Sequence, residues 1–243
     1  TEGKVPSDNS ILIEMWPDLE RGTMNIVFHA LFGRRVNDVL SRVYAYVLGM
    51  VTGENIKITV TDNGFMLTTS LNVDRNAIEN ILNNVKSNNI GDIARKAIRR
   101  TELFKKRFRH CAERSFMLLR RYKGVDVSLA RRQINSEKLI QIVESFNEFP
   151  IIEETYREIL EDFMDLVHAK EVVERIERGE IAIDIIYSHY APSPFAHNII
   201  AYGYSDVILM EDKRKLIIKL QDMVKKAIEN KSKVIASLVQ NIT

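Results

Sequence analysis

Apolar positions in the first third of the chain follow the two-residue period of short strands. Runs such as ILIEMW and MNIVFHA are rich in β-branched and aromatic residues and end at turn-forming residues. We predict strands over residues 11–16, 24–30, 56–61 and 65–70. Between the last two, Asp62-Asn63-Gly64 predicts a tight hairpin, because both residues of an Asn-Gly turn accept a positive φ. Helical spacing predicts helices over 37–51, stopped by Gly53, and over 74–87.

The middle of the chain carries apolar residues at helical spacing almost throughout. We predict helices there over residues 91–100, 103–122, 128–133, 136–146, 150–164 and 168–178. Ser136 suits the N-cap of the fourth of these helices, and Pro150 suits the first turn of the fifth. The pattern therefore predicts a large helical insertion.

A further strand is predicted after the insertion. Residues 180–188, which follow Gly179, read EIAIDIIYS, and we expect such an isolated strand to pair with the N-terminal sheet. Helices are predicted over 194–203 and 212–230. We therefore predict an α+β fold, with a small mixed or antiparallel sheet of about five strands, a large helical insertion and C-terminal helices. The predicted parts are a sheet-and-helix part (1–90), the insertion (91–178) and the returning strand with the last helices (179–243), joined in one compact domain.

Composition is that of an ordinary globular protein, since 45% of the residues are hydrophobic and 28% are charged. The single cysteine, Cys111, rules out an internal disulfide and fits a reducing cytoplasm. No apolar run approaches the roughly 18 residues that a membrane-spanning helix needs, and no signal-peptide pattern is present. The chain starts at Thr1 rather than Met, so we expect a cytoplasmic piece of a longer protein, without a membrane partner.

Positive charge is concentrated in one part of the chain. The formal net charge is only +2, but residues 95–132 hold fourteen Lys or Arg against Glu102, Glu113 and Asp126. That segment is therefore +11 and the rest of the chain is −9. Such asymmetry is typical of a surface that binds a polyanion.

The predicted helix 103–122 is amphipathic. A helical wheel places Phe104, Phe108, Cys111, Ser115, Leu119 and Tyr122 on one face. The other side carries Lys106, Arg107, Arg114, Arg120 and Arg121. Lys123, Arg131 and Arg132 follow shortly after. We expect this helix to pack by its aromatic face and to present its cations outward.

An internal use of these cations is the alternative. Residues 148–165 hold seven acidic side chains against Arg157, so the alternative places an acidic helix beside the basic one. Exposed ion pairs stabilise a protein by only about 0–1 kcal/mol each, so stability alone gives little reason for so many cations. Even if every one of these acidic side chains paired with a cation of residues 95–132, some cations would remain unpaired.

No catalytic group of residues emerges from the sequence. There is no Walker A motif, because Gly3-Lys4 is followed by Val5. The histidines lack metal-ligand spacing, and we expect His29 to be structural. Cys111 lies on the apolar face of its helix, which indicates a buried thiol rather than a nucleophile. Ser193 before Pro194 predicts an N-cap at a rigid corner between a strand and a helix.

Four sequence blocks occur in a fixed order along the chain. They are MNIVFHALFGRRVNDVL (24–40), TVTDNGFML (59–67), CAERSFMLLRRYKG (111–124) with FPIIEETYREIL (149–160), and ERIERGEIAIDIIYSHYAPSPFAHNII (174–200). In this order they resemble the large helicase-related (Lhr) family of superfamily 2 ATP-dependent helicases, in its archaeal form. The similar region is the DEAD/H-associated domain beyond the ATPase core, and the resemblance covers about residues 10–205.

The resemblance implies a parent helicase whose two RecA-like domains and winged helix bind ATP and magnesium and move 3′-to-5′ along a single strand. This region would pack against them and help to enclose the strand, with no cofactor of its own. Arg42, with Arg34 and Arg35, would assist from the first helix. The family carries a base-stacking tryptophan near Leu40; with leucine there, we do not expect stacking, and we expect Trp16 to be structural.

We therefore predict an accessory domain, not catalytic alone, that binds single-stranded DNA or RNA by its backbone and couples it to the ATPase motor. The predicted contact residues are Lys106, Arg107, Arg114, Arg120, Arg121, Lys123, Arg131, Arg132, Arg34 and Arg35. Two alternatives remain open. One is a protein-interaction module that docks on the motor or on a repair partner. The other is a DNA glycosylase, for which the sequence identifies no positioned carboxylate or lysine.

Overall fold

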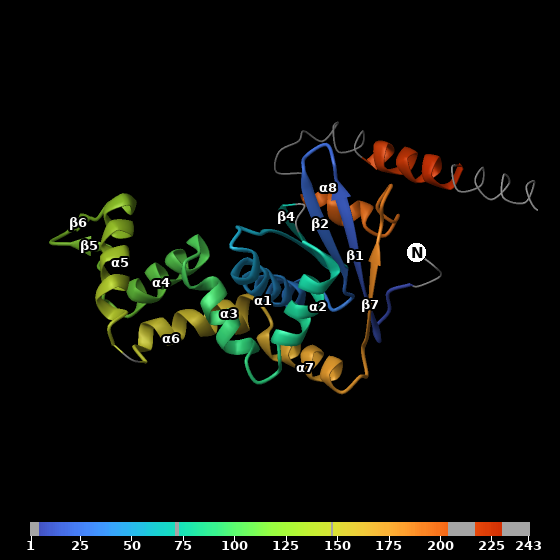
Figure 1. Cartoon of the computed structure of the whole chain (residues 1–243). Helices are drawn as coiled ribbons and strands as arrows, with labels where there is room; N and C mark the ends of the chain where they lie inside the picture. The colour runs from blue at the N-terminus through green and yellow to red at the C-terminus, as the bar shows by residue number, and fades with distance from the viewer. Residues whose placement is uncertain (1–4, 71–72, 147, 204–216, 230–243) are drawn as a thin grey trace, which may run out of the picture.

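A five-stranded sheet with helices on both faces forms the body of the molecule, and a helical arm extends from it (Figure 1). The computed structural model describes residues 5–70, 73–146, 148–203 and 217–229. None of the helices in these ranges is long and apolar enough to cross a membrane. The predicted α+β class is confirmed, and the sheet is of the mixed kind.

The strand order in the sheet is β3-β4-β2-β1-β7. The strands are β1 (Ser10–Asp18), β2 (Thr23–His29), β3 (Lys57–Thr61), β4 (Gly64–Ser70) and β7 (Ala182–Tyr187). All neighbours are antiparallel except β1 and β7, which are parallel. The predicted return of the chain to the N-terminal sheet after the insertion is thus confirmed.

The β3–β4 hairpin was predicted correctly, but its turn lies one residue earlier than expected. Asp62 and Asn63 form the turn, and Gly64 is already the first residue of β4. Gly64 has φ 152°, and a Cβ there would clash with the carbonyl oxygen of Phe28 on β2. Glycine is therefore needed for close approach of two strands rather than for the turn itself.

Alternation along the strands divides the core into two layers. Ile11, Ile13 and Met15 of β1 face the larger layer, which is built on α1 (Arg34–Thr52). Helices α2 (Arg75–Asn84), α3 (Ile90–Arg99) and α7 (Leu166–Glu177) pack around α1. The same hydrophobic cluster continues without a break into the arm, where it includes Phe104 and Phe108.

The opposite face of the sheet is covered by α8 (His197–Gly203) and by the helix 217–229. A smaller cluster joins Trp16, Val27 and Met66 to Ile199 and Leu220 there. The predicted helix 212–230 is confirmed over 217–229, and its remaining residues lie outside the described ones. Trp16 is buried, as expected for a structural residue.

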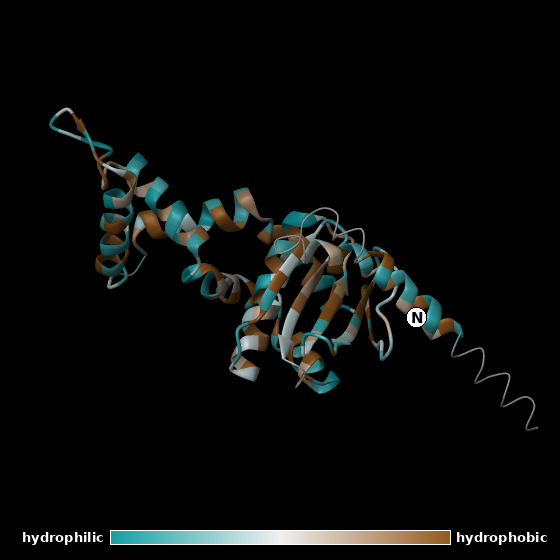
Figure 2. Ribbon diagram, turned by 90° about the horizontal axis from the view of Figure 1, so that it is seen from above, coloured by the Kyte–Doolittle hydropathy of each residue, from teal (hydrophilic) through white to brown (hydrophobic). Residues whose placement is uncertain are grey.

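We call residues 102–157 the arm, and Figures 1 and 2 both show it projecting away from the sheet. It comprises α4 (Glu102–Arg114), β5 (Arg121–Tyr122), β6 (Val125–Asp126), α5 (Leu129–Val143) and α6 (Pro150–Arg157). The π-helical segment η1 (Glu158–Phe163) continues α6 and leads back to α7. Pro150 occupies the first turn of α6, as predicted.

Two predictions in the arm were wrong. The helix predicted over 103–122 ends at Arg114, because Phe116 adopts a left-handed conformation (φ 60°) and the amide of Leu118 turns back to the carbonyl of Ala112. A small hairpin, β5–β6, then reverses the chain. The helices predicted over 128–133 and 136–146 are one helix, α5, capped by Ser128, so Ser136 is a mid-helix residue and not a cap.

Candidate nucleic-acid interface

The cations that the sequence singled out come from three elements of the arm rather than from one helix. Helix α4 buries Phe104, Phe108 and Cys111, as predicted. Leu119 and Tyr122 lie beyond its end and are 50% and 59% exposed, so the predicted apolar face stops short. Contrary to the predicted separation of faces, Arg114 reaches Glu158 and the sulfur of Cys111.

Four of the predicted contact residues already pair with carboxylates. Arg120 and Arg132 share Glu113, at Nε–Oε2 and Nη1–Oε1 distances of 2.7 and 2.9 Å. Burial raises the pKa of Glu113, but hydrogen bonds from both guanidinium groups outweigh this and leave the pKa below its ordinary value. The other pairs are Arg114–Glu158 and Arg121–Asp126, the latter at 3.0 Å. Part of the arm's positive charge is therefore paired with carboxylates of the chain itself, as the alternative predicted.

These pairs differ in how firmly they hold their cations. The Arg132 side chain is only 22% exposed and ties α5 to the buried Glu113 of α4, which makes it a structural residue. Arg121 and Asp126 are 68% and 79% exposed, and a pair in such a setting is worth about 0–1 kcal/mol. A phosphate can compete for Arg121 but hardly for Arg132.

Other cations of the arm have no carboxylate partner within the described part of the chain. They are Lys106, Arg107 and Arg109 on α4, Lys123 in the hairpin, and Arg131 and Lys138 on α5. Arg107 lies over the ring of Phe163 at 5.3 Å, and Lys123 lies over that of Tyr122 at 5.5 Å. A ring contact of this kind does not neutralise the charge. Six positive charges of the described part of the arm are thus available to an external anion.

Lys106 and Arg109 line a cleft between α4 and α5. Its volume is about 220 Å³, and Gln133, Ser136 and Glu137 form the α5 side. Partial burial, reinforced by the charge of Arg109, lowers the pKa of the neighbouring His110. The charge of Glu113 opposes this shift, while Arg107 and Lys106 act in the same direction as Arg109. The local potential around this part of α4 is therefore positive.

The predicted cations of α1 lie in the body of the molecule and have other partners. One nitrogen of Arg35, Nη2, donates to the carbonyls of Glu161, Asp162 and Met164 at 2.7, 3.1 and 2.8 Å, which ties α1 to the end of η1. Arg34 contacts Tyr202 through its hydroxyl and its ring. Leu40 is buried, so no base can stack at that position.

A buried polar cluster on the α8 side of the sheet was missed by sequence reasoning. Glu14 on β1 is fully buried and accepts hydrogen bonds from the Ser188 hydroxyl (2.7 Å) and from the backbone amide and hydroxyl of Ser193 (both 2.6 Å). His29 Nε2 lies 3.2 Å from the same carboxylate, which confirms His29 as structural. Ser193 therefore binds Glu14 and does not cap α8, which begins at His197.

This cluster has the chemistry of a structural anchor. Burial raises the pKa of Glu14, but the bonds from His29, Ser193 and Ser188 outweigh it and keep the pKa below its ordinary value. The serine hydroxyl donates to the carboxylate and not to the histidine, so no nucleophile–base pair forms. A single acidic residue inside the apolar run ILIEMW was the sequence signal for a buried partner.

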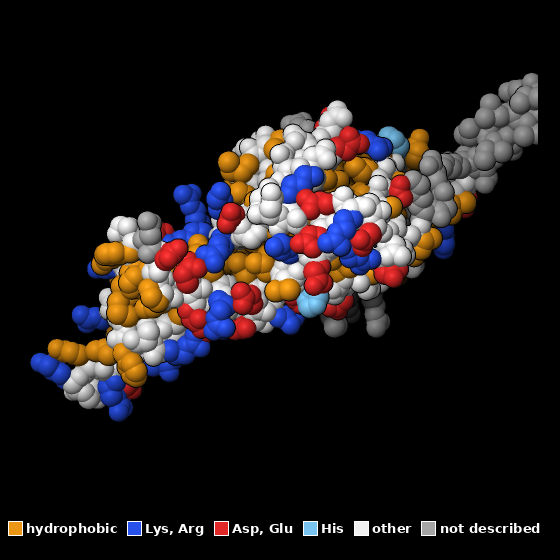
Figure 3. Space-filling model, turned by 90° about the horizontal axis from the view of Figure 1, so that it is seen from below, with side chains coloured by type: hydrophobic (Ala, Val, Ile, Leu, Met, Phe, Trp, Pro, Cys, Tyr) orange, Lys and Arg blue, Asp and Glu red, His pale blue; other side chains and the backbone are white. Residues whose placement is uncertain are grey.

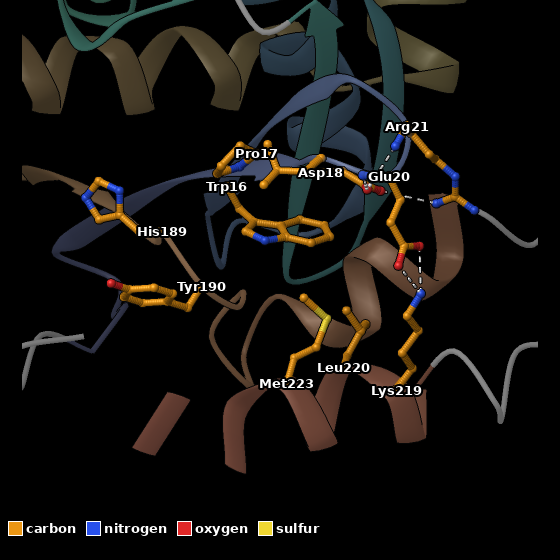
Figure 4. Close-up of a pocket in the computed structure, with 11 residues that line it drawn as sticks. Trp16, Pro17, Asp18, Glu20, Arg21, His189, Tyr190, Lys219, Leu220 and Met223 are labelled. Carbon is orange, nitrogen blue, oxygen red and sulfur yellow. Dashed lines mark hydrogen bonds and ion pairs between the residues drawn. The ribbon is translucent and has the colours of Figure 1, made fainter. Parts of the chain in front are cut away.

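Figure 4 shows a second hollow, where the β1–β2 turn meets the corner after β7 and the helix 217–229. Its volume is about 160 Å³, and Lys219 closes one side through an ion pair with Glu20 at 2.6 Å. Trp16 at its base is 5% exposed, so the indole has little free ring surface. Within the described residues no group of three or more His, Cys, Asp or Glu side chains could hold a metal ion.

Comparison with known proteins places this fold in a family. The family model described as DEAD/H associated matches residues 5–196, most of the chain. The chain belongs to the DEAD/H-associated family. It is 49% identical over 226 residues to the ATP-dependent helicase Lhr-Core of Saccharolobus solfataricus, covering 92% of the chain and 26% of that protein. The predicted resemblance to Lhr helicases is thereby confirmed.

Other Lhr proteins share this DEAD/H-associated region. The chain is 28% identical to the Lhr helicase/uracil glycosylase of Escherichia coli, over 83% of the chain and 13% of that protein. A structure of the Mycobacterium smegmatis helicase Lhr bound to ssDNA and AMP-PNP matches with a TM-score of 0.68 and 28% identity, over 81% of the chain and 24% of that one. The chain spans about a quarter of the length of its archaeal relatives.

Proposed function

We propose that this DEAD/H-associated domain binds single-stranded nucleic acid through its backbone phosphates and helps an Lhr-type helicase to hold the strand during ATP-driven movement. The observation that carries the proposal is the set of arm cations that have no carboxylate partner among the described residues: Lys106, Arg107, Arg109, Lys123, Arg131 and Lys138. The similar M. smegmatis helicase is bound to ssDNA, which supports the same ligand class.

The predicted contact residues have different roles in this proposal. Lys106, Arg107, Lys123 and Arg131 contact phosphates directly, and Arg109 joins them because it lines the same cleft as Lys106. Arg121 exchanges the exposed carboxylate of Asp126 for a phosphate when a strand arrives. Arg114 and Arg120 stay paired with the buried carboxylates of Glu158 and Glu113. Arg132 and Arg35 hold the arm together and to the body.

ATP and magnesium have no place in this mechanism for the chain itself. The sequence contains no G-x-x-x-x-G-K-[ST] motif, so it lacks the backbone cradle and the lysine that hold nucleotide phosphates in P-loop enzymes. In the proposal they bind elsewhere in a parent helicase, on its RecA-like domains. In the proposal, the present chain contributes the cations of the arm, which hold the strand by its phosphates.

Fluorescence anisotropy with a labelled single-stranded oligonucleotide, as DNA and as RNA, tests the proposal across 50–200 mM salt. The logarithm of the affinity should fall linearly with the logarithm of the salt concentration, by about 0.7 for each phosphate contact. The double variant Lys106→Ala/Arg109→Ala should bind more weakly, with a slope that is shallower by about 1 to 1.5. Binding should weaken equally for different base sequences.

A matched pair of cations on α7 and just after it supplies the control. Lys170→Ala/Arg178→Ala removes the same charge from the body of the molecule and should leave affinity and slope close to those of the wild type. If both double variants lose affinity equally, the effect depends on net charge alone, which would contradict the assignment of the binding site to the arm. A wild-type chain that binds no strand at 50 mM salt would favour the protein-interaction alternative.

A further inference from the structure

The end of the arm exposes hydrophobic side chains, each with about half or more of its surface uncovered in the described structure. We call residues 115–129 the arm tip. Its exposed apolar residues are Phe116, Met117, Leu119, Tyr122, Val125 and Leu129. Figure 3 shows hydrophobic and cationic side chains interleaved at this far end of the molecule. A concentrated patch of this kind marks a contact surface, whereas single exposed apolar residues need no explanation.

Phe116 is the most unusual residue of the tip. It adopts φ 60°, a left-handed conformation that is an outlier for a bulky side chain, and its side chain is the most exposed of the tip, at 82%. Glycine or asparagine would fit that backbone with less strain, and the ring adds nothing to the core. Strained residues cluster at binding sites, so the exposed ring indicates a contact outside the chain.

Cations accompany the exposed rings. Arg120 and Arg121 precede Tyr122, and Lys123 follows it with its ammonium 5.5 Å from the ring centroid. Among the described residues, the Arg121 guanidinium pairs with the exposed carboxylate of Asp126 alone. Lys123 carries no carboxylate partner in the part of the chain that the structure describes. The partner of this surface therefore combines negative charge with flat or apolar groups.

Resting on the proposed function, we infer that the arm tip is a stacking platform for unstacked bases of the bound strand. Phe116 and Tyr122 stack on bases, while Arg121 and Lys123 contact the flanking phosphates. Single-strand binding proteins combine rings and cations in this way, because every base has a flat face and every linkage a charge. The tip also lies at the end of the arm that carries the uncompensated cations, so a strand along the arm reaches it (Figure 1).

An acidic protein segment with an apolar side is the competing partner, since Met117, Leu119, Val125 and Leu129 are exposed there too. Two oligonucleotides of equal length separate the two: oligo-dT, and an abasic strand that keeps every phosphate and lacks every base. The wild-type chain should bind oligo-dT more tightly than the abasic strand. Phe116→Ala/Tyr122→Ala should weaken binding to oligo-dT by about 10- to 100-fold, at an unchanged salt slope.

The controls keep each outcome interpretable. Phe116→Tyr retains a ring and should bind like the wild type. Leu129→Ala removes an exposed aliphatic group of the same patch and should have no effect on binding. The double variant should bind the abasic strand as the wild type does. Circular dichroism should show an unchanged fold, because both rings are exposed.

Three results would overturn the inference. If the wild type binds oligo-dT and Phe116→Ala/Tyr122→Ala binds equally well, the rings take no part, while the proposed phosphate binding stands. If Leu129→Ala weakens binding as much as the ring variant, the patch acts as a general apolar surface and fits a protein partner better. If the wild type binds neither strand at low salt, the proposed function itself fails.

Discussion

Glu14 joins four separate segments through one carboxylate. It lies on β1, faces His29 at the end of β2, and binds Ser188 and Ser193 on either side of the corner that follows β7. Each of these donors is buried or partly buried, so losing the acceptor leaves several polar groups unsatisfied at once. The geometry of the corner, and with it the start of α8, depends on this residue.

Glu14→Gln should lower the free energy of unfolding by about 1–3 kcal/mol, because an amide satisfies fewer of the donors. The pKa of Glu14 is below its ordinary value of 4.5, so the ionised carboxylate stabilises the fold above that value. This stabilisation is lost as pH falls through the lower pKa of the folded state. Urea denaturation from pH 7 to 3 should therefore show a difference between wild type and variant that shrinks in acid. An equal difference at pH 7 and pH 3 would contradict this account.

His110 reports on the charge around the α4 cleft. Its pKa is lowered by partial burial and by Arg109, which outweigh the opposing charge of Glu113, with smaller lowering contributions from Arg107 and Lys106. A phosphate bound among these cations offsets their charge, so the pKa of His110 should rise on saturation with a single strand. Titration of the histidine ring signals by NMR measures the shift. His168, which lies on α7 beside Asp165, should not move and serves as the internal control; an unchanged His110 would exclude phosphate binding beside it.

At the scale of elements, Arg35 is the clearest link between the body and the segment that returns from the arm. Its Nη2 group binds three carbonyls at the end of η1, where a π-helical turn leaves carbonyl groups without partners of their own. The same contact sets the approach of α7 to α1. Both helices contribute to the main core.

Arg35→Ala should destabilise the chain by about 1 kcal/mol, since the guanidinium is largely exposed and its bonds are partly replaced by water. Amide hydrogen exchange should quicken over residues 158–164 and stay slow in the sheet. Arg34→Ala, next to it on α1, removes the same charge without touching η1 and is the matched control. Faster exchange spread evenly over the whole chain would argue against a local link.

Helices and strands with a regular apolar pattern could be predicted from the sequence. Elements whose ends depend on the backbone conformation of one residue could not. The five strands of the sheet alternate clearly and are bounded by turn residues, so they were found. In the arm, apolar spacing continues past Arg114, although left-handed Phe116 ends the helix there. The hairpin β5–β6 has strands of two residues, too short for any periodic signal.

The candidate interface shows the same division. Composition located the basic segment, but which cations form ion pairs depends on the tertiary structure. Glu113 pairs with Arg120, which precedes the hairpin, and with Arg132 on α5. Glu158, the partner of Arg114, lies on η1. Arg109 was not singled out, because only the packing of α4 on α5 shows that it shares a cleft with Lys106. The pairing of Arg95 with Glu153 likewise joins segments far apart in the chain.

For the whole molecule, the central question is whether the arm and the sheet are one cooperative unit. One hydrophobic cluster runs from the sheet through α1 and α3 to Phe104, whose ring lies 5.1 Å from that of Tyr156 on α6. Such continuity favours a single unfolding transition. That the parts of the chain form one compact domain stays a prediction, which the following experiment tests.

Phe104→Ala should therefore lower the free energy of unfolding by about 3–5 kcal/mol, as for a fully buried ring, and should speed exchange in the sheet as well as in the arm. Urea unfolding followed by circular dichroism and by exchange should give one coincident transition. Phe163→Ala, at an exposed ring, should cost far less. An early transition confined to residues 102–157 would show that the arm unfolds on its own.

The parallel pairing of β1 with β7 has a consequence for synthesis. Paired residues such as Ser10 and Ala182 are 172 positions apart, so at typical elongation rates a nascent chain waits on the order of ten seconds or more before β7 emerges. Until then β1 presents a bare strand edge that invites association with other nascent chains. Glu14 stands in the middle of that edge, without the two serines that later surround it. A negative charge within an otherwise apolar strand disfavours pairing with a strand of another chain.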